Sequence, residues 1–170
     1  MKSAFEVFLK DITTEPKRYI FDLDDSFFSE KEKSEIQGGN VKIQVVAQKK
    51  AEAFEFGFEI EGVVQIVCDR CLDIMDLSIV ASDSVIVKQG EQTDEDFIFI
   101  PECEETFDLE WVLYETVALQ IPIQHFHEDG ECNKEMIKKL NACSTEKLAE
   151  EENKTTDPRW EKLKDILNNN

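Results

Sequence analysis

The chain has 170 residues and a formal net charge of −19, with 38 acidic side chains against 19 basic ones. So much negative charge repels phosphate backbones, which disfavours a protein that coats naked RNA. The length suits a single domain with one core, for which 41% apolar residues and twelve Phe provide ample material.

Neither the N-terminus nor any later stretch has the apolar run of a signal peptide or of a membrane span, which needs about 18 residues. We therefore expect a cytoplasmic protein. In that reducing compartment the five cysteines are thiols or metal ligands rather than a disulfide framework.

The first half of the chain predicts a mainly antiparallel sheet. Phe54, Phe56, Phe58 and Ile60 alternate with polar residues or Gly, the period-two pattern of a strand with one buried face. Gly62 interrupts this run and predicts a tight turn or a bulge. Asp24-Asp25-Ser26 predicts the start of a short helical segment, which we expect Gly38-Gly39 to close. The expected strands are 4–12, 18–23, 41–45, 53–61, 63–68, 73–80, 83–88 and 97–100.

The second half predicts helices. Residues 108–121 carry apolar side chains at spacings of three and four, a stripe that we expect to face the sheet. A short helix is expected over 135–140. Asp157 and Pro158 predict the start of a last helix. The prediction is an α+β fold, a bent antiparallel sheet or partial β-barrel with one central helix and a C-terminal helix. Its parts are a domain over 1–143, an acidic linker over 144–156 and the helix over 157–170.

Two cysteines, Cys68 and Cys71, flank Asp69 and Arg70 at a turn between strand-like runs. Three interpretations remain open. The thiols bind zinc, form a redox pair, or pack as small apolar groups in a structural turn. A redox pair would be expected at the start of a helix, whose dipole lowers the thiol pKa.

Zinc needs two further ligands besides this pair. His127 and Cys132 are the best candidates, with His125 or Cys143 as substitutes.

The Cys-Asp-Arg-Cys-Leu motif at 68–72, with the strand before it, resembles the large ribosomal RNA subunit accumulation family of YceD-like proteins. Asp157-Pro158-Arg159-Trp160 and the following residues to Leu163 resemble that family's closing signature. The resemblance implies a non-enzymatic role in ribosome biogenesis, in support of the accumulation or processing of large-subunit ribosomal RNA.

The net charge then has two interpretations. It keeps the protein soluble, or it suits a basic partner such as a ribosomal protein or an RNA-processing protein, with any contact to large-subunit RNA indirect or confined to a local patch. Four residues are candidates for recognition of that partner: Asp69, Arg70, Arg159 and Trp160. Guanidinium groups suit phosphate or carboxylate, although local ion pairing with Asp69 or Asp73 would also account for Arg70. Trp160 either packs on the domain's own sheet or contacts a partner.

Sequence motifs of common enzymes, such as a phosphate-binding loop, a nucleophile elbow or a paired-histidine zinc motif, are absent. We therefore expect no catalytic residues. Two alternatives belong to other functional classes. One is a small zinc-binding adaptor unrelated to ribosomes, and the other is a redox or hydrolytic enzyme built on Cys68 and Cys71.

Overall fold

The computed structural model describes residues 4–31, 34–90 and 97–144. They fall into two compact units, one ending at Cys132 and the other beginning at Asn133. Except for Ser144, the predicted linker and C-terminal helix lie outside the described residues, and so do Arg159 and Trp160.

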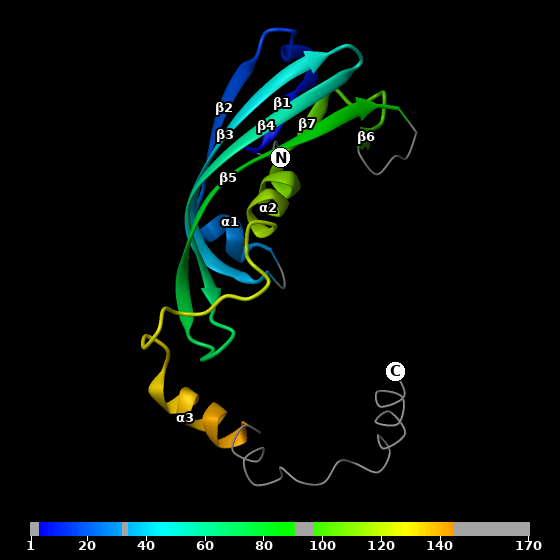
Figure 1. Ribbon diagram of the computed structural model, residues 1–170. Helices are drawn as coiled ribbons and strands as arrows, with labels where there is room; N and C mark the ends of the chain where they lie inside the picture. Colours follow the sequence, from blue (N-terminus) through cyan, green and yellow to red (C-terminus); the bar gives the residue numbers. More distant parts are fainter. Residues whose placement is uncertain (1–3, 32–33, 91–96, 145–170) are drawn as a thin grey trace, which may run out of the picture. The chain divides into compact units, whose positions relative to one another are not determined.

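The first unit is built on a bent sheet of five strands in the order β2-β3-β4-β5-β6 (Figure 1). Four of them pair antiparallel, whereas β6 runs parallel to the last residues of β5. Their bounds are β2 Lys17–Leu23, β3 Ile36–Lys50, β4 Ala53–Val67, β5 Ile74–Gln89 and β6 Ile98–Ile100. The predicted α+β fold is confirmed, with an open bent sheet rather than a closed barrel.

The core lies on one face of this sheet. Phe54, Phe56, Phe58 and Ile60 are all buried, which confirms the alternation read from the sequence. In β3 the facing residues Ile43, Val45 and Ala47 are in register with Ile60, Phe58 and Phe56, and they too are buried. Directly paired residues share a face, so these pairs form one apolar layer.

The predicted strand break at Gly62 is wrong, since β4 continues through it, and β5 likewise joins the two predicted strands 73–80 and 83–88. Gly62 instead permits a close approach. A Cβ there would lie 2.4 Å from the Asn40 carbonyl oxygen and 2.5 Å from Val41 Cα. In β3, Gly39 has φ +148°, and a Cβ there would lie 2.5 Å from the Val63 carbonyl oxygen. Because these glycines lack a side chain, the strands stay paired at this contact.

A short helix, α1 (Asp25–Ser29), follows Asp24 as predicted. The Asp24 carboxylate accepts hydrogen bonds from the backbone N–H groups of Ser26 and Phe27, which caps the helix. The helix does not extend to Gly38-Gly39, which belong to β3. The Gly39 N–H instead donates to Asp25 Oδ1 at 2.7 Å and ties the helix to the strand.

The central helix is shorter than predicted. It is α2 (Glu110–Ala118), and it lies against the concave side of the sheet (Figure 1). The predicted stripe does face the core, since Leu109, Val112, Leu113, Thr116 and Val117 are all buried. A two-stranded sheet of β1 (Glu6–Phe8) and β7 (Thr106–Asp108) leads into this helix. The predicted strand 4–12 is therefore only partly correct, because a 3-10 turn, η1 (Leu9–Asp11), replaces its second half.

The second unit contains α3 (Lys134–Cys143), which confirms the short helix predicted near 135–140. Asn133 caps it by accepting hydrogen bonds from the N–H groups of Glu135 and Met136. Among the helices of the described residues, none combines the length and the apolar character needed to cross a membrane.

Candidate metal centre

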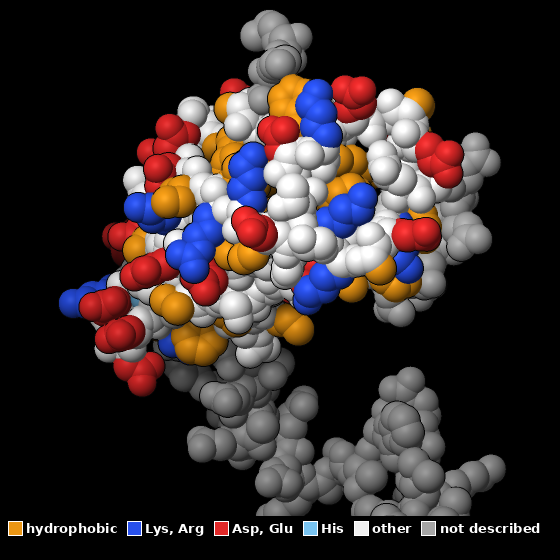
Figure 2. Space-filling view, turned by 90° about the horizontal axis from the view of Figure 1, so that it is seen from above, with side chains coloured by type: hydrophobic (Ala, Val, Ile, Leu, Met, Phe, Trp, Pro, Cys, Tyr) orange, Lys and Arg blue, Asp and Glu red, His pale blue; other side chains and the backbone are white. Residues whose placement is uncertain are grey.

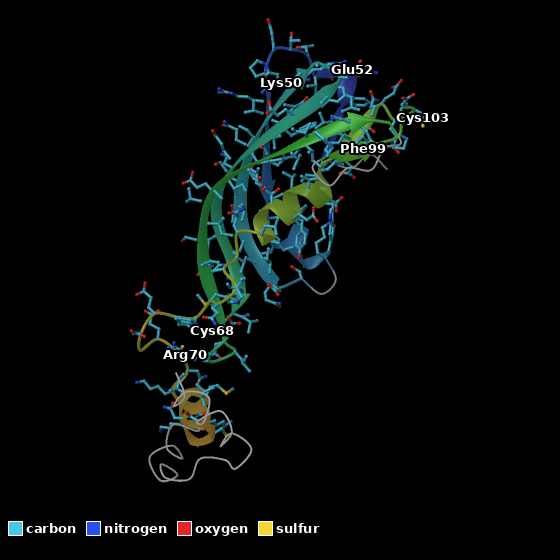
Figure 3. The ribbon with its side chains drawn as sticks, turned by 45° about the vertical axis from the view of Figure 1, so that its right-hand side comes forward. Lys50, Glu52, Cys68, Arg70, Phe99 and Cys103 are labelled. Carbon is cyan, nitrogen blue, oxygen red and sulfur yellow. The ribbon has the colours of Figure 1, made fainter. Side chains whose placement is uncertain are left out.

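The turn between β4 and β5 holds the two cysteines of the motif side by side. The Cys68 N–H donates to the Asp73 carbonyl at 2.9 Å, and the Leu72 N–H donates to the Cys68 carbonyl at the same distance. Leu72 closes the turn with φ +63°, a conformation that is uncommon for a side chain of this size. Both cysteine side chains are buried, whereas Leu72 is exposed. Figure 3 shows Cys68 and Arg70 at this end of the hairpin, away from Lys50 and Glu52 at the other end.

The chain that follows α2 returns to this turn. The Asp69 N–H donates to the His125 carbonyl at 3.0 Å, and the His125 N–H donates to Asp69 Oδ2 at 2.9 Å. Beside them the Arg70 guanidinium carbon lies 4.4 Å from the centre of the Phe126 ring. These contacts fix the segment that carries His127 and Cys132 against the motif.

Four side chains consequently converge: Cys68, Cys71, His127 and Cys132. Their ligand atoms all lie within 4.8 Å of one another. The Cys68 and Cys132 Sγ atoms are 3.9 Å apart, and His127 Nδ1 lies 3.3 Å from Cys71 Sγ and 4.0 Å from Cys132 Sγ. Zinc–sulfur bonds of about 2.3 Å in a tetrahedron place the sulfurs about 3.8 Å apart. The spacing of the four groups therefore fits a tetrahedral metal ion.

The electrostatics of the cluster favour one thiolate. Burial works to raise the pKa of Cys68. It is outweighed by the backbone N–H groups of Cys71, His127 and Arg70, which with the His127 side chain lower this pKa to about 6. The contact with Cys68 raises the pKa of His127. The pKa of Cys132 is raised, first by burial and then by the neighbouring Cys68 and Cys71. Three thiolates this close would repel one another, so their joint ionisation calls for a cation.

The structure thus brings together the four residues that were predicted as the best ligand set, and this cluster could hold a metal ion. Neither of the two substitutes belongs to this cluster. The His125 ring stands 3.6 Å from Asp69 Oδ1, and Cys143 is exposed at the end of α3 in the second unit. Cys68 and Cys71 lie in a turn between strands, not at the start of a helix as a thioredoxin-like site would require.

No sequence pattern indicated the pairing of Asp69 with His125. Asp69 and Arg70, predicted to recognise a partner, are here engaged with His125 and Phe126. A carboxylate and a histidine 56 positions apart have no shared pattern in the sequence, so only the fold reveals their contact.

Comparison with known proteins gives one result at the level of a family. No match was found among curated proteins or among solved structures. Residues 56–167 match the profile described as large ribosomal RNA subunit accumulation protein YceD. The matched range contains the Cys68–Cys71 turn, α2 and the segment that supplies His127 and Cys132. Since it covers most of the chain, the protein belongs to the YceD family.

Proposed function

We propose that this protein is a non-enzymatic ribosome-biogenesis factor that supports the accumulation of large-subunit ribosomal RNA through contacts with a basic protein partner. In this proposal a zinc ion bound by Cys68, Cys71, His127 and Cys132 has a structural role. The family supports the process, and the cluster of three thiols and one imidazole supports the metal.

Zinc is the metal that best matches this donor set. Thiolate and imidazole ligands in a tetrahedral arrangement are typical of zinc in proteins. Four protein ligands fill the coordination sphere, whereas a catalytic zinc ion keeps a position open for water. The ion would join the β4–β5 turn to the segment after α2. Unpaired thiols so close together also favour a reducing compartment, and we place the protein in the cytoplasm.

The surface charge supports a protein partner rather than RNA. Figure 2 shows Lys and Arg side chains interspersed with Asp and Glu on the end of the molecule seen from above. Several lysines of the described residues pair with carboxylates: Lys10 with Glu105, Lys17 with Asp11 and Lys50 with Glu55. Positive groups that lie beside carboxylates are poorly placed to neutralise phosphates, and the net charge of −19 repels them.

The decisive experiment is depletion of the protein in cells, followed by measurement of the ratio of large- to small-subunit ribosomal RNA. The ratio should fall and should recover when the wild-type gene is restored. An unchanged ratio would refute the proposed role. Tight binding of purified protein to fragments of large-subunit RNA, with no other protein present, would refute the claim that it acts through protein contacts.

A further inference from the structure

The strand β5 has an open edge. It pairs with β4 from Ile74 to Lys88, but on its other side β6 pairs only with Val87, Lys88 and Gln89. Among the described residues, no backbone hydrogen bond reaches the outer edge between residues 74 and 86. In Figures 1 and 3 this part of β5 forms a border of the sheet.

The sequence of this edge lacks the usual protection against pairing with another strand. Residues 74–82 read Ile-Met-Asp-Leu-Ser-Ile-Val-Ala-Ser, with Asp76 as their one charge and with no Lys, Pro or Gly. Exposed edges are commonly blocked by such residues or by a bulge. The opposite edge, β2, is shorter and begins with Lys17 and Arg18.

Asp83 sets a limit to the unprotected stretch. It is in register with Phe58, a fully buried residue, so it stands on the core-facing side of the edge. A charge that points inward discourages strand addition. The stretch available to another strand therefore runs from Ile74 to Ser82, where the core-facing positions are apolar.

Those core-facing side chains are incompletely covered. Ile79 is buried, but Met75, Leu77 and Ala81 are only half-buried although they pack against the core. They are in register with core-facing residues of β4, namely Ile66, Val64 and Ile60. A strand added beside β5 would cover these apolar groups and use the free backbone groups at the same time.

The negative charge beside the edge of β5 favours binding of a basic segment. A groove of about 730 Å³ lies between the start of β5 and the segment that carries His127. Asp76, Glu128 and Glu131 supply three carboxylates to it, while Ile74, Leu77 and Phe126 supply apolar surface. None of its lining residues is Lys or Arg. A segment that alternates apolar and basic side chains matches this surface in both respects.

We propose that the edge of β5, from Ile74 to Ser82, binds an extended basic segment of another protein as an added strand. The inference rests on the proposed function, because it specifies how a basic partner is held. A second copy of this chain would bring its own net charge of −19 against the same acidic groove, and RNA would meet the same repulsion.

The test uses the full-length zinc-loaded protein and a nine-residue peptide of alternating valine and lysine, with a valine–glutamate peptide of equal length as control. Leu77→Lys places a charge on the core-facing side of the edge. Val80→Lys makes the same change in charge on the outer face of the same strand, where the side chain is 82% exposed. Binding is measured by fluorescence anisotropy, and strand addition by hydrogen exchange at the amides of residues 74–82.

The lysine peptide should bind the wild type and Val80→Lys, slow exchange at the β5 edge, and bind Leu77→Lys at least about tenfold more weakly. Zinc content and circular dichroism establish that both variants are folded, and Ala81→Lys replaces Leu77→Lys should the latter unfold. Equal binding of the two peptides, equal binding by the two variants, or no binding at all would overturn the proposal. So would a dimer in sedimentation that Leu77→Lys dissociates, because the edge would then belong to a second copy.

The same variants separate this inference from the proposed function. If Leu77→Lys restores the large-subunit RNA ratio as well as Val80→Lys does in depleted cells, the docking edge is wrong while the function stands. If depletion leaves the ratio unchanged but the lysine peptide binds as described, the function is wrong while the edge stands.

Discussion

Two hydrogen bonds and one contact between side chains join Asp69 to His125. Each backbone N–H donates to the other residue, one to a carbonyl at 3.0 Å and one to a carboxylate at 2.9 Å, and the His125 ring lies 3.6 Å from the same carboxylate. His125 stands two positions before His127. The pair therefore positions one candidate ligand relative to Cys68, the neighbour of Asp69.

Removal of this carboxylate should loosen the proposed zinc site without changing any ligand. We expect Asp69→Ala to weaken zinc binding about 10–100-fold, as is typical when a group that orients a ligand is lost. A competition assay with a chromogenic chelator measures the change. Asp73→Ala is a control in the same turn, and an equal loss of affinity in both variants would argue against a specific role for Asp69.

Serine substitutions at cysteines inside and outside the cluster test the proposed ligand set. Cys132→Ser should abolish stoichiometric zinc in protein purified without chelators and lower the thermal midpoint, because only three of the four proposed ligands then remain. Cys103→Ser and Cys143→Ser should retain zinc, since both residues are exposed and lie outside the cluster. Full zinc content in Cys132→Ser would exclude this residue as a ligand.

Zinc affinity should depend on pH with a definite sign. The pKa of His127 is raised above its usual 6.5 by contact with Cys68, and that of Cys68 is lowered to about 6. As the pH falls, protons therefore compete with zinc first at Cys132, whose pKa is raised above its usual 9.0, then at His127 and, near pH 6, at Cys68. The apparent affinity should decrease steeply between pH 7 and pH 5, as measured by chelator competition. A constant affinity over that range would contradict this ligand assignment.

Two glycines of β4 should differ sharply in their tolerance of a methyl group. Gly62→Ala should lower the free energy of unfolding by about 1–3 kcal/mol, because the new Cβ would overlap the backbone of Asn40 and Val41. Gly57→Ala should change it by no more than about 0.5–1 kcal/mol, since the nearest atom, the Val46 carbonyl oxygen, is 4.0 Å away. Urea denaturation of both variants decides the matter, and equal losses would mean that the close contact at Gly62 is unimportant.

The parts of the fold that the sequence predicted are those with a strong local pattern. Phe54 to Ile60 alternate over a single buried face, and the α2 stripe repeats at helical spacing, so both were identified correctly. Gly62 was misread because a glycine at a turn and a glycine at a close strand contact look identical in a sequence. The paired residues of β1 and β7 are about a hundred positions apart in the sequence, and no local pattern indicates that they pair.

The candidate site likewise contains some features that the sequence predicts and others that it does not. The motif of Cys68 and Cys71 is a local signal, and the small number of other soft ligands pointed to His127 and Cys132. The pairing of Asp69 with His125 depends on how the chain returns after α2, and so does the contact of Arg70 with Phe126. Such contacts are set by tertiary structure and require coordinates.

The candidate ligands lie far apart in the sequence, and this affects when the site can form during translation. Cys68 and Cys132 are 64 positions apart, and α2 lies between them. While the protein is being made, the hairpin of β4 and β5 leaves the ribosome well before the fourth ligand exists. The proposed metal site can therefore be complete only after the whole first unit, including α2, has been translated, which would make uptake of the ion a late event in its assembly.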